Sequence, residues 1–388
     1  QYIVLPVVVS LLAVLYAAPL NAQELAPQST ICIEASTGIV LDEENADLVR
    51  PPASMIKLIM MLLVDEGVEQ GKWPYDKAIP VSLHAEKMGG TQVYLNYGET
   101  WPLIKLMEAL SIASANDAAM AISESLWGSE EAYRAAMYER TQSLGMTRTR
   151  FYSVHGLPPD PGESPDQTTA RDMTRLAQAC IQRPKIMQWT GMQELQFRPE
   201  DPLKYNTNKL LWRMPDCDGL KTGYIRAAGF CVAATAERNG VRLISVVMGS
   251  PSKYGRFNRA EEMMDHGFDE VQPFQVARAN QPFGDPVPVL DGKPAAVTLI
   301  ALENLSLPLS DSAREALEYH HSFSGMLEPP LKAGTHIGTV QVQLQGQILG
   351  EFPVTIAQDL HFDGWHLSFE KGVAKWEGLD TPQSVPAP

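Results

Sequence analysis

The spacing of apolar side chains changes along the chain and divides it into parts with different predicted elements. Apolar runs at 30–33 and 38–41 bracket a short turn of small residues, which predicts a β-hairpin. From about Ala53 to Ile181, apolar residues recur at intervals of three and four, which predicts helices. From Asp218 onward the runs are short and rich in β-branched residues, which predicts strands. Strands at both ends with helices between them indicate one sheet assembled from distant segments.

The helical part contains four predicted segments and one long loop. The segments are 53–67, 101–127 with an interruption near 114–116, 131–144 and 169–181. Pro51 and Pro52 precede the first segment, where proline is tolerated because the first N–H groups of a helix have no partner within it. Four prolines and a glycine at 158–165 fit neither helix nor strand, so this stretch is predicted to be an exposed loop.

The second half predicts two β-structures joined by a helix. An antiparallel meander is expected at 219–224, 229–236 and 241–249. A helix that carries Phe257, Ala260, Met264 and Phe268 on one face would pack on that sheet. Residues 283–357 have few helix signals, and apolar Val340, Val342 and Leu344 alternate with glutamines, so we expect a small β-domain of its own.

Each end of the chain carries a segment of another kind. Residues 2–18 are almost wholly apolar and lead into small and then polar residues, which is typical of a secretory signal, with an uncleaved anchor as the alternative. Near the other end, Phe362, Trp365, Phe369, Val373 and Trp376 fall on one helical face, and contact with a bilayer surface and packing on the β-domain both stay open. The predicted parts are therefore a signal peptide (1–22), a catalytic domain (23–272), a β-rich domain (273–357) and an amphipathic segment with a disordered tail (358–388).

Charge and composition exclude several other functions. The chain has 31 basic and 46 acidic residues, and its net charge of −15 disfavours non-specific binding to nucleic acid. Eight histidines form no metal-binding motif, and the adjacent His320 and His321 are interpreted as a solvated pair in a loop, so no metal and no cofactor is expected. Cys217 and Cys231 could pair across a hairpin, but we favour two buried free thiols.

Three short motifs carry the candidate chemistry. Ser54 and Lys57 open the first predicted helix, where positions three apart share a face. Ser114 and Asn116 lie between two helical runs, and residues 221–223 (Lys-Thr-Gly) lie on a predicted strand. Each motif alone is most simply a helix cap or an exposed strand end. In this order and these settings, together they are typical of serine enzymes that recognise penicillins.

The same residues predict how acyl transfer would work. A serine hydroxyl is a poor nucleophile until a base takes its proton. A buried Lys57 near Lys221 would have a lowered pKa, because burial and a like charge both disfavour the ammonium form. Neutral Lys57 could then act as general base toward Ser54, and N–H groups at the helix start would stabilise an oxyanion.

With these residues in place, the chain resembles the serine-type D-alanyl-D-alanine carboxypeptidases, the low-molecular-mass penicillin-binding proteins. The similarity covers roughly residues 28–357 and includes 35–67, 114–118, 155–157, 206–211, 218–223 and 227–230. The resemblance implies an α/β (α+β) fold, a β-lactamase/transpeptidase-like domain with an antiparallel sheet flanked by helices and a helical subdomain, plus a small C-terminal β-domain. It also implies an exported, periplasmic protein that acts on peptidoglycan stem peptides and is acylated by β-lactam antibiotics. Peripheral attachment to the outer face of the inner membrane stays open, and the oligomeric state is not predicted.

The resemblance also implies catalytic roles by position. Ser54 would be acylated by a pentapeptide stem with release of the terminal D-alanine, and Lys57 would be its base. Ser114 and Lys221 would relay protons, and Asn116 would hold the substrate amide and Lys57.

Substrate binding is implied for the Lys-Thr-Gly strand. Lys221 and Thr222 would bind the terminal carboxylate, and Gly223 and Tyr224 would line the site. The oxyanion hole would be the N–H groups of Ser54 and Tyr224.

Departures from the family pattern and three rival functions complete the prediction. Tyr224 stands where many relatives have histidine, and Thr207 stands where some have arginine, so a carboxylate contact from position 207 is absent. A β-lactamase would need a second base, typically a loop glutamate followed by an apolar residue and asparagine; the sequence Glu-Ser-Pro-Asp-Gln at 163–167 does not fit this pattern, and β-lactamases lack the added β-domain. A D,D-endopeptidase is not excluded by the motifs. A non-catalytic wall-binding protein would have no need of Ser54 and both lysines.

Overall fold

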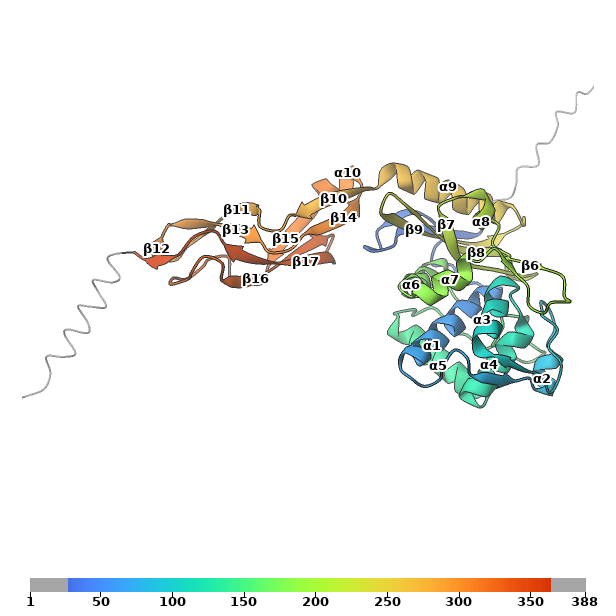
Figure 1. The fold of residues 1–388 in the computed structure, drawn as a ribbon. Helices are drawn as coiled ribbons and strands as arrows, with labels where there is room; N and C mark the ends of the chain where they lie inside the picture. Colours follow the sequence, from blue (N-terminus) through green and yellow to red (C-terminus); the bar gives the residue numbers. More distant parts are fainter. Residues whose placement is uncertain (1–26, 364–388) are drawn as a thin grey trace, which may run out of the picture.

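The computed structural model describes residues 27–363, so the predicted signal peptide and most of the C-terminal segment lie outside the described residues. The described chain is elongated, with a mixed α and β body at one end and an all-β body at the other (Figure 1). No helix within the described range is long and apolar enough to cross a membrane.

A five-stranded antiparallel sheet forms the centre of the first body. Its strand order is β2-β1-β9-β8-β7, so the first hairpin pairs with the last strand of the meander. The edge strand β7 carries the Lys-Thr-Gly motif. The strand bounds are β1 Ser29–Glu34, β2 Val40–Glu44, β7 Cys217–Ile225, β8 Gly229–Arg238 and β9 Val241–Ser250. The sheet predicted from distant segments is confirmed.

Helices cover both faces of this sheet. Helix α9 (Gly255–Glu270) packs against β8 and β9 on one face, and its predicted apolar residues are buried. A helical group lies on the other face (Figure 1). At its centre is α1 (Lys57–Glu69), which is buried almost all round and continues directly from the 3₁₀ helix η1 (Ala53–Ile56). Around α1 lie α3 Leu103–Ile112, α4 Asn116–Trp127, α5 Glu130–Ser143, α6 Ala170–Ile181 and α7 Pro184–Gly191.

Several short elements escaped prediction from the sequence. They have too few residues to show a clear period, and α7 has only eight. The others are α2 Leu83–Glu86, α8 Leu210–Arg213, β3 Ala78–Pro80, β4 Thr100–Pro102, β5 Glu194–Leu195 and β6 Lys204–Tyr205.

One residue, Val271, separates the end of α9 from the first strand of the second body, which has its own apolar core. Its main sheet has the order β11-β13-β17-β16-β15, and β10 pairs with β14 beside it. The bounds are β10 Gln272–Ala277, β11 Pro282–Pro288, β12 Gly292–Lys293, β13 Ala296–Ala301, β14 Leu305–Leu309, α10 Asp311–Glu315, β15 Leu317–His321, β16 His336–Leu344, β17 Gln347–Ile356 and β18 His361–Phe362.

Details of this β-body confirm one prediction and correct another. Val340 and Val342 are buried as the alternation predicts, and the chain turns at Gly346 between β16 and β17. His320 and His321 are exposed, but they lie on strand β15 and not in a loop. The two bodies touch where Gln347 Nε2 donates to Thr37 O at 2.5 Å.

The cysteines are buried free thiols throughout the described chain. This confirms the favoured interpretation of Cys217 and Cys231, which form no disulfide. Burial raises the pKa of the Cys217 thiol to about 11 and also raises that of Cys231, so neither is a reactive thiolate near neutral pH.

Candidate active site

The three motifs converge on one cleft between the helical group and the edge strand β7. The cleft has a volume of about 490 Å³ and is lined by Ser54 from η1, Ser114 from the turn before α4, Asn116 from the start of α4, and Thr222 and Gly223 from β7. The structure therefore brings together residues that are far apart in the sequence. Tyr224 on β7 also lines the cleft, and the remaining two predicted residues, Lys57 and Lys221, are buried, at 0% and 1% exposure.

Two glycines pack closely against the backbone around Ser54 and fix its position. A Cβ on Gly223 would lie 2.6 Å from Pro52 O and 3.1 Å from Ser54 N, so strand β7 can approach the helix start only without a side chain there. A Cβ on Gly156 would lie 2.2 Å from Ala53 O, and Gly156 has φ +81°, which glycine adopts most readily. Ser54 is thus held between a strand and a loop.

Lys57 lies within hydrogen-bond distance of three oxygens. Its Nζ is 3.0 Å from Ser54 Oγ, and it donates to Asn116 Oδ1 at 2.7 Å and to His155 O at 2.8 Å. Burial, and then the charge of Lys221, hold the pKa of Lys57 well below its ordinary value, although Asp117 and Asp166 oppose this shift. The environment therefore favours the neutral amine, as the sequence analysis predicts.

Lys221 is buried on strand β7 and has no carboxylate partner among the described residues. Its Nζ donates to Thr222 O at 3.2 Å. Burial, followed by the charge of Arg256, lowers its pKa to about 7. An amine with this pKa can be charged or neutral near neutral pH, depending on what binds beside it.

Ser114 has a strained backbone and a free hydroxyl. Its φ is +59°, which is uncommon for a residue other than glycine, and its buried Oγ has no hydrogen-bond partner in the described chain. The structure thus shows no hydrogen bond between Ser114 and Lys221, although both border the same site. On the opposite wall, the Thr222 hydroxyl donates to Thr207 Oγ1 at 2.7 Å.

The cleft is also more basic than the motifs indicate. Lys209, Lys253 and Arg256 line it, and no acidic side chain does. Neither Lys209 nor Lys253 forms an ion pair within residues 27–363; Lys209 Nζ donates to Asn206 O at 3.0 Å and lies 4.5 Å from the centre of the Trp212 ring. Sequence reasoning missed these cations. Lys209 stands two positions after Thr207 and could have been found from that spacing, whereas nothing in the sequence near Lys253 marks it.

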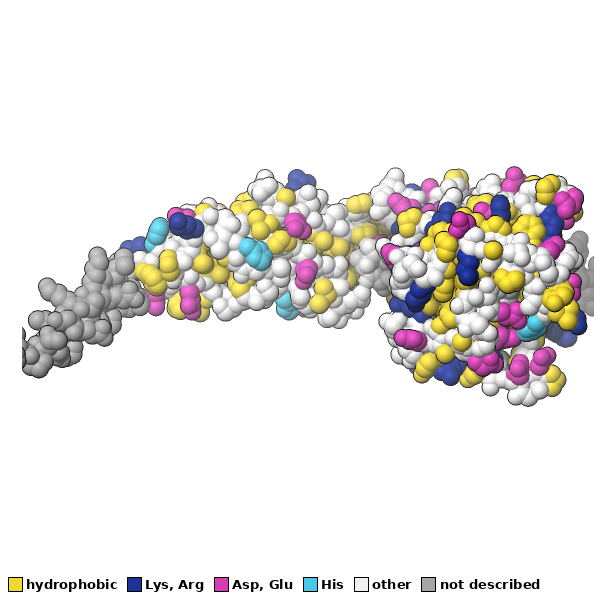
Figure 2. Space-filling view, turned by 60° about the horizontal axis from the view of Figure 1, so that its bottom comes forward, with side chains coloured by type: hydrophobic (Ala, Val, Ile, Leu, Met, Phe, Trp, Pro, Cys, Tyr) yellow, Lys and Arg dark blue, Asp and Glu magenta, His cyan; other side chains and the backbone are white. Residues whose placement is uncertain are grey.

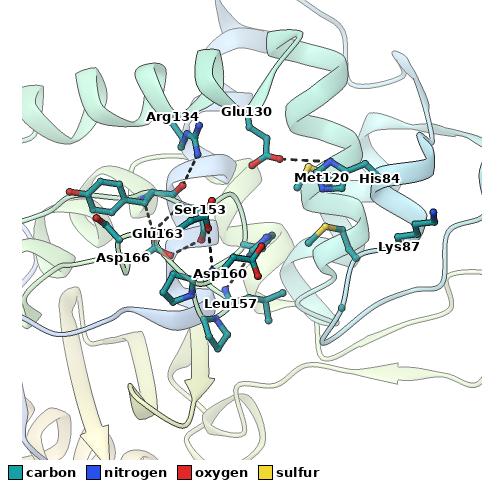
Figure 3. Close-up of a pocket in the computed structure, with 17 residues that line it drawn as sticks. His84, Lys87, Met120, Glu130, Arg134, Ser153, Leu157, Asp160, Glu163 and Asp166 are labelled. Carbon is teal, nitrogen blue, oxygen red and sulfur yellow. Dashed lines mark hydrogen bonds and ion pairs between the residues drawn. The ribbon is translucent and has the colours of Figure 1, made fainter.

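A second cavity of about 700 Å³ lies beside the cleft, and Leu157 lines both (Figure 3). It is bordered by α2, α4, α5 and the loop at 158–165, and it holds charged side chains of both signs. Asp160 and Glu163 of that loop line this second cavity and not the reaction cleft. The loop therefore places no acidic base beside Ser54, which agrees with the argument against a β-lactamase.

A serine at a helix start, a buried lysine beside it and Lys-Thr-Gly on the edge of an antiparallel sheet define the class of serine acyl-transfer enzymes that recognise penicillins. Comparison with known proteins gives the family. Residues 16–252 match the family of D-alanyl-D-alanine carboxypeptidase (peptidase S11), and residues 272–361 match the C-terminal domain of penicillin-binding protein 5. The chain belongs to this carboxypeptidase family, and it is a serine-type D-Ala-D-Ala carboxypeptidase.

Individual relatives extend over both bodies. The D-alanyl-D-alanine carboxypeptidase DacF of Bacillus subtilis is 30% identical over 358 residues, which is 90% of each chain. The solved structure of a peptidoglycan synthesis regulatory factor, PBP3 of Streptococcus pneumoniae, superposes with a TM-score of 0.71 over 87% of this chain and 99% of its own, at 24% identity, and so supports the fold. Penicillin-binding protein D2 of Listeria monocytogenes, solved in an ampicillin-bound form, is 31% identical over 62% of this chain and 97% of its own, with a TM-score of 0.57. The family is one of exported cell-wall enzymes, and membership implies a peptidoglycan peptide as substrate.

Proposed function

We propose that Ser54 is the nucleophile and that neutral Lys57 is its general base. The observation that carries this proposal is the set of three oxygens around Lys57 Nζ. A neutral amine has two N–H bonds and one lone pair. With the two N–H bonds directed to Asn116 Oδ1 and His155 O, the lone pair is left for the third neighbour, Ser54 Oγ, whose proton it can accept. Asn116 and His155 then act as the groups that orient the base.

The reaction that follows is acyl transfer in two steps. Ser54 Oγ attacks the carbonyl carbon of the penultimate D-alanine, and the negative charge that forms on the carbonyl oxygen is stabilised by the N–H groups of Ser54 and Tyr224. The C–N bond then breaks. The proton that Lys57 took from Ser54 passes from Lys57 through Ser114 and Lys221 to the nitrogen of the leaving D-alanine. Water hydrolyses the ester on Ser54 and regenerates the hydroxyl.

The substrate we propose is a pentapeptide stem bound along strand β7. This strand is the edge of the sheet, so a peptide in extended conformation can pair with it. The terminal carboxylate would meet Thr222 and Lys221, with Lys209 and Lys253 adding positive charge at the same end. A carboxylate beside Lys221 would also raise the pKa of this amine from about 7, so that substrate binding itself would return the charge to Lys221.

The same site would react with β-lactams, since their strained amide presents a carbonyl and a carboxylate in a comparable arrangement. We also propose that residues 23–272 form the catalytic domain, that residues 273–357 form a β-rich domain without catalytic residues, and that the enzyme acts in the periplasm on the cell wall.

A labelling experiment tests the assignment of Ser54. The protein is incubated with a fluorescent penicillin and, separately, with a diacetyl-lysyl-D-alanyl-D-alanine peptide. Wild type is expected to form a stable covalent adduct and to release D-alanine, and Ser54→Ala is expected to do neither. Ser129→Ala is the matched control, because Ser129 also stands at the start of a helix in this domain but lies outside the cleft. Ser129→Ala should behave as wild type.

The other outcomes either refute the assignment of Ser54 or indicate a rival function. Absence of any adduct on wild type would refute acylation of Ser54. An adduct that clears within seconds would indicate a β-lactamase. A stable adduct without D-alanine release, together with cleavage of a crosslinked muropeptide dimer, would indicate a D,D-endopeptidase.

A further inference from the structure

Asp166 is a buried carboxylate that follows the exposed loop at 158–165 and accepts hydrogen bonds from the other end of the same loop (Figure 3). Its Oδ1 accepts from Tyr152 N at 2.6 Å and from Ser153 N at 2.9 Å. Its Oδ2 accepts from the Ser153 hydroxyl at 2.6 Å. The side chain is only 7% exposed, and these three donors satisfy much of its hydrogen-bonding capacity.

A short path of hydrogen bonds leads from this carboxylate to the catalytic base. Ser153 Oγ accepts from Gly156 N at 2.8 Å. Gly156 directly follows His155, whose carbonyl oxygen accepts from Lys57 Nζ at 2.8 Å. Gly156 also packs so closely on the Ala53 carbonyl that even a Cβ atom would not fit between them, so the loop cannot shift toward the helix start. The position of the His155 carbonyl therefore depends on the bonds that Asp166 and Ser153 make.

We propose that Asp166 is a positioning residue for acylation: its carboxylate holds residues 152–156 so that His155 O stays aligned with Lys57, and its negative charge stabilises the ammonium that Lys57 becomes when it takes the proton of Ser54. This inference rests on the proposed role of Lys57 as base. It adds a residue that lies outside the three motifs and does not line the reaction cleft.

The charged and titratable groups around Lys57 come from three directions. Lys221 on β7 opposes the ammonium form, while Asp117 at the start of α4 and Asp166 favour it. His155 is neutral near pH 7, because burial, and then the charge of Lys57, lower its pKa to about 4. Asp117 accepts hydrogen bonds from backbone N–H groups at 93, 95 and 118, whereas Lys57 Nζ is hydrogen-bonded to Ser54, Asn116 and His155. Of the two carboxylates, Asp166 is the one whose side chain is joined through the Ser153 hydroxyl and Gly156 N to the segment that carries His155 O, an oxygen that contacts the base.

The same contacts exclude a direct chemical role for Asp166. Its side chain lines the second cavity and not the cleft that contains Ser54. Three donors already occupy its oxygens, so it is not placed to activate water for deacylation. Its effect must pass through Lys57, which gives the experiment its readout.

The test measures the second-order rate of acylation by a fluorescent penicillin from pH 4.5 to 9 for four proteins: wild type, Asp166→Asn, Ser153→Ala and Glu34→Gln. Asp166→Asn keeps the size of the side chain and removes its charge. Ser153→Ala keeps the charge and breaks the bridge to Gly156. Glu34→Gln is the matched control, since Glu34 is also a buried acid (1% exposed) that accepts from the backbone and hydroxyl of a turn, at Thr37, but does not line the cleft.

The expected results differ for the three variants. In Asp166→Asn the ammonium of Lys57 loses a stabilising charge, so its pKa falls further and the acid limb of the profile moves to lower pH by about half a unit or more. The maximal rate of this variant falls by about tenfold or more because the base is weaker and less well aligned. Ser153→Ala should lower the maximum but leave the acid limb near its wild-type position. Glu34→Gln should leave both unchanged, even if its melting temperature falls.

Two results would overturn the inference: a wild-type profile for Asp166→Asn, or an equal change in the profile of Glu34→Gln. If Asp166→Asn does not fold, Ser153→Ala decides the proposal. Its maximal rate of acylation must fall below that of wild type. Ser153→Thr keeps the hydroxyl and must restore the wild-type rate. Failure of the proposed function is distinguishable, because wild type would then form no adduct on Ser54 at any pH, or Lys57→Met would form the adduct at the wild-type rate.

Discussion

The interiors of the two bodies contain different kinds of side chain. The core of the first body includes Lys57, Lys221, Asp117 and Arg256, all at most 4% exposed. In the β-body, Thr355 is the only buried polar side chain of the described residues 272–363. The face shown in Figure 2 has charged side chains of both signs spread over the first body and few over the β-body.

This difference indicates that the first body loses some free energy of folding by burying the ionisable groups that its active site needs. Burying a charged or ionisable group is unfavourable unless partners compensate for the lost hydration. Neither Lys57 nor Lys221 has a salt bridge to a carboxylate within the described chain, yet both are fully enclosed. The described residues of the β-body bury no charged side chain, so apolar packing alone explains this interior. Substitutions of the buried ionisable groups in the first body should therefore lower activity without a matching loss of stability, and substitutions in the second body should not affect activity.

The largest effect is expected for Lys57→Met. Loss of a general base typically costs about 10²–10⁴-fold in rate, so acylation by a fluorescent penicillin should fall by about a thousandfold. The free energy of unfolding should change little, because removal of a buried amine without a carboxylate partner offsets the loss of its hydrogen bonds to Asn116 and His155. Rapid-mixing fluorescence and urea unfolding measure the two effects.

Lys185→Met is the matched control for this change, since Lys185 is a partly exposed lysine of the same domain outside the cleft. A large loss of stability in Lys57→Met, with none in Lys185→Met, would show that the buried amine stabilises the fold and would contradict the comparison.

Gly156→Ala should have the second-largest effect. The new Cβ would lie 2.2 Å from Ala53 O, so the loop or the helix start must move. Displacement of reacting groups by about 1 Å can cost about 10²-fold in rate, and acylation should fall by that order. Gly145→Ala is the control, because Gly145 has a similar φ of +70° but no atom within 4 Å of the added Cβ. If both variants lose activity equally, backbone strain and not the contact with Ala53 is responsible.

Such contacts mark the limit of what the sequence predicts. The sheet, the helices and the β-body follow from apolar periodicity, since burial of one face imposes that period. Ser54 and Lys57 could be identified because their spacing places them on one face of a helix, and the Lys-Thr-Gly strand because this motif follows them in the order and setting typical of the enzyme class. The carbonyl of His155, the fit of Gly156 against Ala53 and the cations Lys209 and Lys253 could not be predicted. They depend on loops whose path is set by tertiary contacts and leaves no period in the sequence.

The third prediction concerns pH and Lys221. Its pKa of about 7 in the free enzyme means that the charged form declines above this pH. If Lys221 binds the substrate carboxylate as a cation, kcat/KM for the D-Ala-D-Ala peptide should fall by about tenfold per unit above pH 7, while kcat persists to higher pH because bound carboxylate raises the pKa.

Stability should change in the opposite direction over the same range. Between pH 7 and the ordinary value of 10.5 the unfolded chain binds a proton at this lysine that the folded chain does not, so the free energy of unfolding should rise with pH. Parallel kinetic and urea titrations measure both, and Lys221→Met should remove this contribution to the stability profile. Parallel declines of activity and stability in wild type would count against the assignment.

A smaller effect is expected for Lys209→Met. This cation is partly exposed, so its attraction for the substrate carboxylate is about 1 kcal/mol, which corresponds to a rise of roughly fivefold in KM. The value of kcat should change little, and Lys209→Arg should restore KM. A peptide that ends in a carboxamide should bind equally well to wild type and to Lys209→Met; a difference between them would show that Lys209 acts through packing on Trp212.

The smallest effect on activity is expected in the β-body, where Phe352→Ala removes a ring that is 1% exposed and lies 4.8 Å from the ring of Phe283. Loss of a buried phenylalanine usually costs about 3–5 kcal/mol of stability. Calorimetry should show a lower melting temperature for the β-body, while kcat/KM measured below that transition stays at the wild-type value.

The matched change in the first body is Phe257→Ala, because Phe257 is fully buried on α9 and its ring lies 4.5 Å from the Arg256 guanidinium that donates to Gly223 O. Phe257→Ala should lower both stability and kcat/KM, and equal activity in the two variants would mean that the hydrogen bond from Arg256 on α9 to Gly223 O does not position strand β7.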